Sequence, residues 1–276
     1  MPATTPANAA PPTELPPLLQ IDAVSYRYKA SLPPVMEDIS LDIRYGEFFV
    51  LLGPSGCGKT TILNQVAGFE KPTTGQIRVR EERITGPSPD RAVIFQGHDS
   101  LLGWLTVRQN VEFPLKVAGV STTQRRERTQ EVLELVELAG QADKFPHELS
   151  GGMKQRVQIA RGLVTDARVL LMDEPFGALD AQTRTSLQLQ LSDIWERERR
   201  TVLFITHDIA EAVILGDRVG VMSSGPSAYL HSIVDIGLDR PRLRSPEFNA
   251  YVDLLERTVT AAKRREPLPE RAGEAA

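Results

Sequence analysis

The chain has a single cysteine, no long apolar run and no excess of basic residues, and each shortage excludes a class of protein. With Cys57 alone, no intrachain disulfide can form, which favours a reducing compartment. No apolar run approaches the ~20 residues that a membrane-spanning helix needs. The N-terminal residues lack the basic and apolar stretches of a signal peptide. If this protein serves a membrane, we expect it to do so by docking to another chain.

The charge balance is slightly acidic. The 36 Asp and Glu residues outnumber the 32 Lys and Arg residues, for a net charge of −4. Chains that bind nucleic acid or anionic lipid through their general charge usually show the opposite balance. We therefore expect no nucleic-acid partner. The length of 276 residues and the globular composition suit one large domain, alone or with an inserted subdomain.

Short apolar runs alternate with longer amphipathic stretches, which predicts an α/β fold. Continuous apolar runs of strand length are typical of strands covered on both faces, and such strands form parallel sheets with crossover helices. A glycine after a helical stretch predicts the end of that helix, and Gly68 stands in this place after residues 60–67. The strand-like runs occupy residues 46–52, 93–95, 169–172 and 202–205.

The regions that lack this alternating pattern predict the boundaries of domains and subdomains in the chain. No strand pattern occurs between about residues 99 and 165, and residues 121–139 predict a helix, so we expect a helical insertion in the α/β core. The tail after the core has one amphipathic piece, 248–255, where we expect the ordered structure to end. We predict a disordered Pro/Ala-rich tail over 1–17, a domain over 18–240, and a short extension over 241–276 with a frayed end. Within the domain, the core comprises 18–98 and 166–240, and the helical subdomain comprises 99–165.

A glycine-rich loop, Gly53-x-x-x-x-Gly58-Lys59-Thr60, joins a predicted strand to a predicted helix. In that context the pattern predicts a phosphate-binding loop, because glycines let backbone N–H groups curl around phosphate oxygens and a helix N-terminus favours an anion. Lys59 supplies charge for the β- and γ-phosphates, and the Thr60 hydroxyl is a candidate Mg²⁺ ligand. The alternative, a glycine turn that matches by chance, is disfavoured by the flanking strand and helix.

The residues predicted to contact the nucleotide in this loop are Gly53, Pro54, Ser55, Gly56, Cys57, Gly58, Lys59, Thr60 and Thr61. We expect Cys57 to be a neutral filler, because its backbone N–H rather than its thiol faces phosphate. A redox role for this thiol is the alternative.

Two carboxylates end the apolar run at 169–172. Asp173 is placed to bind a phosphate-bound Mg²⁺, and Glu174 to accept a proton from the attacking water or to orient that water. An acidic pair at a strand end is ordinarily surface charge, but a neighbouring phosphate loop favours the catalytic interpretation.

His207 and Gln96 each follow another apolar run, at the ligand-binding edge of a parallel sheet. His207 is predicted to contact the γ-phosphate and hold the water, with a core or surface histidine as the alternative. Gln96 is predicted to bind Mg²⁺ or the water, although read alone it is equally a surface glutamine.

Residues 149–156, Leu-Ser-Gly-Gly-Met-Lys-Gln-Arg, resemble the signature motif of ABC-type ATPases. Six motifs stand in that family's order over roughly residues 19–225, which makes the resemblance specific. It implies a P-loop ATPase fold with a mainly parallel sheet core, an antiparallel β subdomain and an inserted α-helical subdomain. It also implies ATP and Mg²⁺ as cofactors. The other five motifs are the phosphate loop, Gln96, Asp173 with Glu174, Leu179 with Asp180, and His207.

The resemblance implies a second copy of the chain as partner. In the family, two nucleotide-binding subunits pack head to tail with two ATP molecules between them. Ser150, Gly151 and Gly152 would then touch the γ-phosphate held by the partner's phosphate loop, and Asp180 would organise the contact between the copies. An aromatic residue of the first strand region stacks on adenine in this family. Tyr28 matches that place best, with Tyr26 as competitor and an ordinary surface aromatic as the other alternative.

Three segments look like those of the nitrate, sulfonate and taurine importer subgroup: 85–91, 101–107 and 173–180. This implies transmembrane permease subunits as partners, a solute-binding protein as an indirect one, and a peripheral place on the cytoplasmic face of the inner membrane. Gly103 departs from the subgroup, which usually has proline there. Trp104 and Leu105 are predicted either to contact the permease or to be buried in the helical insertion. A soluble ABC ATPase that acts on ribosomes or DNA is the alternative function.

Overall fold

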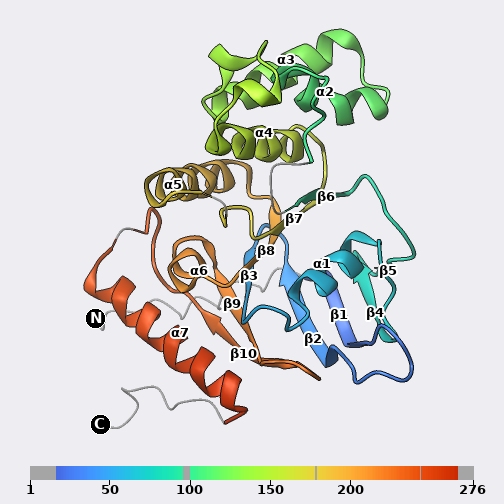
Figure 1. The fold of residues 1–276 in the computed structure, drawn as a ribbon, viewed down its shortest axis with the longest axis vertical. Helices are drawn as coiled ribbons and strands as arrows, with labels where there is room; N and C mark the ends of the chain where they lie inside the picture. Colours follow the sequence, from blue (N-terminus) through green and yellow to red (C-terminus); the bar gives the residue numbers. More distant parts are fainter. Residues whose placement is uncertain (1–16, 96–99, 178, 243, 267–276) are drawn as a thin grey trace, which may run out of the picture.

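A six-stranded, mainly parallel sheet forms the centre of the computed structural model, which describes residues 17–95, 100–177, 179–242 and 244–266 (Figure 1). Its strand order is β10-β9-β3-β8-β7-β6, with β10 antiparallel to β9 and the other pairs parallel. Every residue of the central strands β3, β7 and β8 is buried, as their unbroken apolar runs predicted. The bounds are β3 Phe48–Leu52, β6 Arg91–Ile94, β7 Val169–Asp173, β8 Thr201–Thr206, β9 Arg218–Met222 and β10 Leu230–Asp235.

A second sheet, antiparallel and in the order β2-β1-β4-β5, packs over one face of the central sheet together with α1. Because side chains alternate along a strand, β3 supplies Phe49 and Leu51 to this core and Phe48 and Val50 to the core on the opposite face. The antiparallel β subdomain implied by the family resemblance is therefore present. The bounds are β1 Pro17–Tyr26, β2 Met36–Arg44, β4 Thr74–Val79, β5 Glu82–Arg83 and α1 Lys59–Ala67.

A helical lobe occupies the stretch without strand pattern and stands at the top of Figure 1. Side chains that accept a backbone N–H begin its helices: Thr106 for α2, Ser121 for α3 and Ser150 for α4. The predicted helix at 121–139 is too long. The α-helix ends at Leu135, because Glu137 takes a left-handed conformation and the chain turns to bury Leu138. The bounds are α2 Val107–Val117, α3 Thr122–Leu135, η1 Ala139–Gln141, η2 Pro146–Glu148 and α4 Gly151–Leu163.

The remaining helices cover the other face of the central sheet: α5 Ala181–Glu198, α6 Ile209–Leu215 and α7 Pro246–Arg264 (Figure 1). The expectation that order ends near Leu255 was wrong. The buried stripe of α7 continues through Thr258, Ala261 and Ala262, so the helix gains packing on α6 and β9 beyond that point. Among the described residues, no helix has both the length and the apolar content to cross a membrane.

Candidate functional site

The glycine-rich loop leaves the carboxyl end of β3 and enters α1, in the context that the sequence predicted. Gly56 and Gly58 have φ values of 78° and 94°, which L side chains rarely adopt, and Gly58 is the N-cap of α1. Gly53 is constrained by contact, since a Cβ there would lie 2.9 Å from the Cβ of Met222. The loop is therefore a tight curl of backbone that ends at a helix N-terminus, the geometry of an anion site.

Lys59 lies within this curl. Its side chain is buried with the loop around it, and Nζ donates to the carbonyl oxygens of Gly53 at 2.8 Å and Pro54 at 2.9 Å. Two carbonyl oxygens are weak partners for a full charge, so phosphate oxygens can replace them at a gain. The loop thus holds a positive charge at the place where the sequence predicted phosphates.

Asp173 ends β7 beside the start of α1, and the Thr60 hydroxyl donates to its Oδ2 at 2.9 Å. Burial raises the pKa of Asp173, and the charge of Glu174 raises it further, while the bond from Thr60 acts in the opposite direction. A hydroxyl and a carboxylate in contact are hard oxygen ligands, which is the donor set that Mg²⁺ prefers. A cation bound here would favour the ionised form of Asp173. Thr60 and Asp173 therefore fit the predicted metal site.

Glu174 and His207 come from neighbouring strands and meet at the carboxyl edge of the sheet. The imidazole Nδ1 lies 2.9 Å from Glu174 Oε2, and an ionised carboxylate can only accept this bond. Glu174 has φ of 43°, a strained value for a residue with a side chain, and its N–H donates to the Ile205 carbonyl at 3.0 Å. The fold thus aims this carboxylate against a local backbone preference, as expected of a functional position.

Two other predicted loop residues have their side chains in the interior. Cys57 is fully buried, and burial raises the pKa of its thiol, so it is a packing residue with little thiolate character. Thr61 is buried within α1. Gln96 lies outside the described residues, so its predicted part in binding Mg²⁺ or water stays a prediction.

The two candidate adenine-stacking tyrosines differ in exposure. Tyr28 follows β1 and is 64% exposed, whereas Tyr26 is half-buried against the core under the antiparallel sheet. Their rings meet edge to face at 5.2 Å between centroids. Burial and the neighbouring carboxylate of Glu70 raise the pKa of Tyr26. Tyr28 therefore has the freer ring face, which favours it as the residue that stacks on a base.

The residues predicted to contact a second copy gather at two adjacent helix N-termini. Ser150 caps α4 and Asp180 caps α5, where it accepts a bond from the Thr183 N–H at 3.0 Å. This bond lowers the pKa of Asp180. A Cβ on Gly152 would lie 2.6 Å from the methyl carbon of Thr183, so only glycine lets the two helices start this close together. Within the described residues, no hydrogen bond or ion pair joins these helix starts to the phosphate loop.

Comparison with known proteins identifies the protein family that has this site geometry. The family model described as "ABC transporter" matches residues 36–177, which include the phosphate loop, the capped start of α4 and the Asp173–Glu174 pair. The chain belongs to this family. It is an ABC-type ATPase, which binds and hydrolyses ATP.

Two curated relatives and one solved structure illustrate the match. An ATP-binding protein of Brucella abortus (strain 2308) is 51% identical over 238 residues, 85% of this chain and 90% of that protein. The nitrate import ATP-binding protein NrtD of Synechococcus elongatus is 46% identical over 230 residues, 82% of this chain and 84% of that protein. The dimeric, post-hydrolysis structure of the ATP-binding cassette MJ0796 with ADP and Pi has a TM-score of 0.68 at 30% identity and covers 80% of this chain and all of that one. The predicted ABC ATPase fold is thus confirmed.

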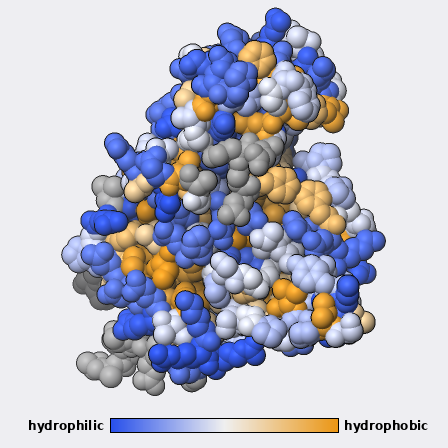
Figure 2. Space-filling model, viewed as in Figure 1, coloured by the Kyte–Doolittle hydropathy of each residue, from blue (hydrophilic) through white to orange (hydrophobic). Residues whose placement is uncertain are grey.

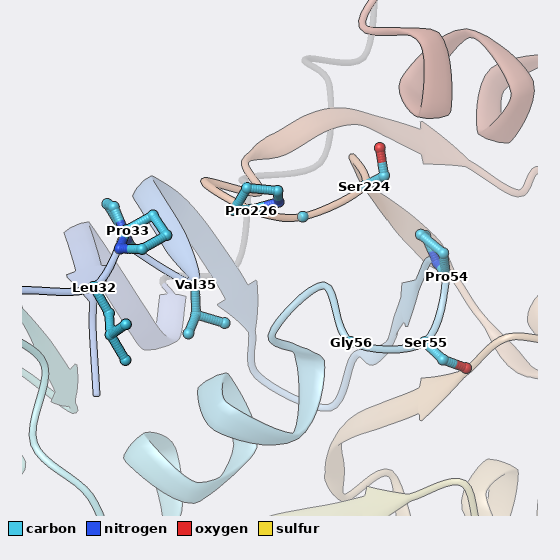
Figure 3. A pocket seen from close by; sticks show the side chains of 10 residues that line it. Leu32, Pro33, Val35, Pro54, Ser55, Gly56, Ser224 and Pro226 are labelled. Carbon is cyan, nitrogen blue, oxygen red and sulfur yellow. The ribbon is translucent and has the colours of Figure 1, made fainter. Parts of the chain in front are cut away.

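The structure of this ABC ATPase shows a cavity that sequence reasoning missed. It measures about 450 Å³ and borders the phosphate loop. Figure 3 shows Pro54, Ser55 and Gly56 on one side and Leu32, Pro33 and Val35 on the other, with the turn that bears Ser224 and Pro226 between them. The Pro-Pro and Gly-Pro pairs mark both turns in the sequence, but nothing in the sequence brings them together.

A second missed feature of the ABC ATPase is the buried carboxyl of Glu211 behind His207. It accepts bonds from the Thr206 hydroxyl at 2.6 Å and from the Gln188 amide at 3.1 Å. Burial raises its pKa. Because Thr206 directly precedes His207, this network fixes the strand end from which the imidazole projects.

Proposed function

We propose that this ABC ATPase is the energy-coupling subunit of an importer for a small anion, and that it works as a dimer with two ATP molecules between the copies. The observation that carries the proposal is the pair of helix starts at Ser150 and Asp180. Ser150 and Gly151 are exposed, and helix N-termini favour anions. Among the residues that the structure describes, no hydrogen bond or ion pair joins these N-termini to the chain's own phosphate loop. A second copy supplies the phosphate that they would bind.

Within each composite site the residues divide the work. The curled loop and Lys59 would bind the phosphates, and Thr60 with Asp173 would hold Mg²⁺, which would neutralise phosphate charge while water attacks the γ-phosphorus and ADP leaves. Glu174 would accept a proton from the attacking water. His207, bonded to that carboxylate through Nδ1, would orient it and present Nε2 to the γ-phosphate. Loss of the γ-phosphate removes the charge that joins the copies, so the dimer reopens.

An exposed apolar surface supports a membrane-protein partner. Phe69 and Phe95 stack in the open at 6.1 Å between centroids, and Trp104 is 74% exposed. Of the two alternatives for Trp104, burial in the helical lobe is therefore wrong. Figure 2 shows hydrophobic residues on the underside of the helical lobe and on the body just below it. We assign this surface to the transmembrane permease, because an exposed apolar patch that includes large aromatic side chains marks a site of protein interaction.

Gly103, next to Trp104, stands where the importer subgroup usually has proline. A Cβ at this position would have no neighbour within 4 Å, so the missing proline leaves open space rather than a packing defect. The relative named for nitrate import supports nitrate, or another small oxyanion such as a sulfonate or taurine, as the solute. In this scheme a solute-binding protein delivers the solute, and the chain lies peripherally on the cytoplasmic face of the membrane.

The test is co-purification followed by transport. The tagged chain should bring down an integral membrane protein from detergent-solubilised membranes, and a Trp104→Ala, Phe69→Ala variant should bring down much less. Vesicles that contain the complex should take up labelled nitrate only with internal ATP. Recovery of ribosomes or DNA instead would support the soluble alternative, and uptake of a sulfonate or taurine alone would correct the solute.

A further inference from the structure

Hydrogen bonds join the C-terminal end of α7 to the turn between β9 and β10. Arg265 follows the helix, and its Nη2 lies 3.3, 2.5 and 3.0 Å from the carbonyl oxygens of Ser224, Pro226 and Ser227. Its guanidinium carbon lies 5.6 Å from the centre of the Tyr229 ring. In return, the Ser224 hydroxyl donates to the Lys263 carbonyl at 3.2 Å, which satisfies a free carbonyl of the helix end.

This turn is one wall of the cavity beside the phosphate loop (Figure 3). Ser224, Gly225 and Pro226 line that cavity, and a Cβ on Gly225 would lie 3.4 Å from the Gly56 carbonyl oxygen. The turn also holds the opposite wall, because the N–H groups of Ser227 and Ala228 donate to the carbonyls of Pro34 and Val35 at 2.8 and 3.0 Å. A shift of the turn therefore moves two of the three walls.

The conformation of the turn needs support. Ser227 has φ of 53°, in the left-handed region that is strained for an L residue with a side chain. The bonds from Arg265 reach the carbonyl of Ser227 and of the residue before it, so they hold the strained residue from both sides. Few other side chains could do this, since a guanidinium presents several donors in one plane.

The contact between Arg265 and the turn is separate from the packing that holds α7 on the body of the protein. Buried Phe248, Leu255 and Ala262 fix the helix on α6 and β9, and Arg265 lies exposed beyond the last of them. In the part of the chain that the structure describes, the hydrogen bonds of its guanidinium all reach the turn. One residue earlier, Nη1 of Arg264 lies 4.0 Å from Oε1 of Glu266, and the Arg264 side chain is 68% exposed. Arg264 therefore offers a matched control.

We propose that Arg265 is a positioning residue for ATP, which fixes the turn at residues 224–227 as one wall of the nucleotide cavity. The inference rests on the placement of the nucleotide at the phosphate loop under the proposed function. It makes the C-terminal helix, far from the phosphate loop in sequence, part of the ATP site. Removal of the guanidinium should loosen nucleotide binding while the hydrolytic residues stay in place.

The experiment compares full-length Arg265→Ala, Arg265→Lys and Arg264→Ala. ATP binding is measured by calorimetry in the Glu174→Gln background, and ATP turnover is measured in the otherwise unchanged chain. For Arg265→Ala we expect the Kd and the KM for ATP to rise about three- to tenfold, the effect of one or two net hydrogen bonds, with kcat within twofold. Arg265→Lys should recover part of the affinity, because an ammonium can still reach a carbonyl. Arg264→Ala should behave as the unchanged chain.

Unchanged Kd and KM in a folded Arg265→Ala protein would overturn the proposal, as would equal losses in Arg264→Ala. A fall in kcat with unchanged KM would also overturn it, because the wall would then serve chemistry and not binding. If Arg265→Ala fails to fold, Arg265→Lys and a Tyr229→Leu variant, which removes the ring under the guanidinium, decide the same question. Lys59→Ala serves as the separate check on the site: normal ATP affinity in that variant would refute the placement of ATP at the loop, whatever Arg265 does.

Discussion

At the scale of the residue, chemistry is concentrated where β7 and β8 end. Asp173 is buried and bonded to Thr60, while its neighbour Glu174 turns outward toward His207. The left-handed φ of Glu174 lets two consecutive carboxylates point in different directions, toward the metal-binding and proton-transfer roles that we propose for them. The pair is therefore more than local acidic charge, since each member has its own partner.

Replacement of Glu174 by glutamine tests the proton-transfer role. Glu174→Gln keeps the shape and the bond to His207 but cannot accept a proton, so ATP hydrolysis should fall by about 10²- to 10⁴-fold. ATP binding should persist, and the variant should stay as a closed dimer in gel filtration with ATP. Glu131→Gln, on the exposed side of α3, is the control and should hydrolyse ATP normally. Wild-type turnover in Glu174→Gln would remove Glu174 from the mechanism.

The buried carboxyl of Glu211 predicts a pH effect on stability. Burial raises its pKa, so the folded chain holds this proton more tightly than the unfolded chain, whose carboxyl has pKa of about 4.3. That contribution to the free energy of unfolding is present below the unfolded pKa and is lost as pH rises through the raised folded value.

Glu211→Gln removes this titration and keeps an oxygen for the Thr206 hydroxyl. The decrease in Tm between pH 5 and pH 8 should therefore be smaller in Glu211→Gln than in the unchanged chain. Thermal unfolding at a series of pH values measures it. The same slope in both proteins, with Glu131→Gln as reference, would show that Glu211 does not titrate differently on folding.

At the scale of the element, the starts of α4 and α5 form one surface. Ser150 and Asp180 each cap their helix with a side chain that accepts a backbone N–H. Gly152 lets the Thr183 methyl approach, so the two N-termini lie side by side. Their summed partial charge is positive, which suits a phosphate presented from outside.

The close approach of the α4 and α5 starts can be tested by the addition of one methyl group at Gly152. In Gly152→Ala the new Cβ would meet the Thr183 methyl carbon at 2.6 Å, so the helix starts must separate. We expect ATP turnover to fall roughly tenfold, about 1.4 kcal/mol of transition-state stabilisation, while ATP binding by the monomer is kept. Adding Thr183→Ser, which removes that methyl, should restore most of the activity. Gly103→Ala is the matched control, since a Cβ there meets nothing within 4 Å.

At the scale of the whole molecule, the two halves of the proposed site come from different parts of one chain. The phosphate loop joins β3 to α1 in the body, whereas α4 belongs to the helical lobe and α5 lies just below it (Figure 1). The head-to-tail dimer that we propose would bring these halves together, and it would give the exposed helix starts a phosphate held by the other copy.

A mixing experiment tests this shared site. Ser150→Arg and Lys59→Ala should each lose ATP-dependent dimerisation and nearly all turnover. In a heterodimer of the two, the Ser150→Arg copy still has a normal phosphate loop and the Lys59→Ala copy a normal α4 start, so one composite site is intact. We expect ATP-dependent pairing to return in part, as measured by cross-linking or light scattering of the mixture. No recovery at any mixing ratio would contradict the head-to-tail arrangement.

Much of the fold could be predicted from local patterns. The runs at β3, β7 and β8 are continuous and apolar because both faces of those strands are covered. The loop from Gly53 to Thr60 contains Gly56 and Gly58, whose positive φ values favour glycine. The prediction for 121–139 was wrong at its end, because burial of Leu138 and not helical periodicity sets the turn after Leu135. Periodicity alone could not give this, since it contains no information on distant packing partners.

The sequence by itself determined which groups are candidates for the chemistry of this protein: a phosphate loop, one carboxylate proposed to bind a metal, one proposed to accept a proton, and a second helix start suited to an anion. Each is marked by residues that are neighbours in the chain. Only the tertiary structure decided which of them face one another. It paired Glu174 with His207, opened the cavity between three distant turns, and placed Arg265 against Ser224, 41 residues away. The reason is physical. Backbone preference and residue type act locally, so they can be inferred from neighbouring residues in the sequence. Cavities and long-range side-chain contacts arise from the packing of whole elements and have no local signal.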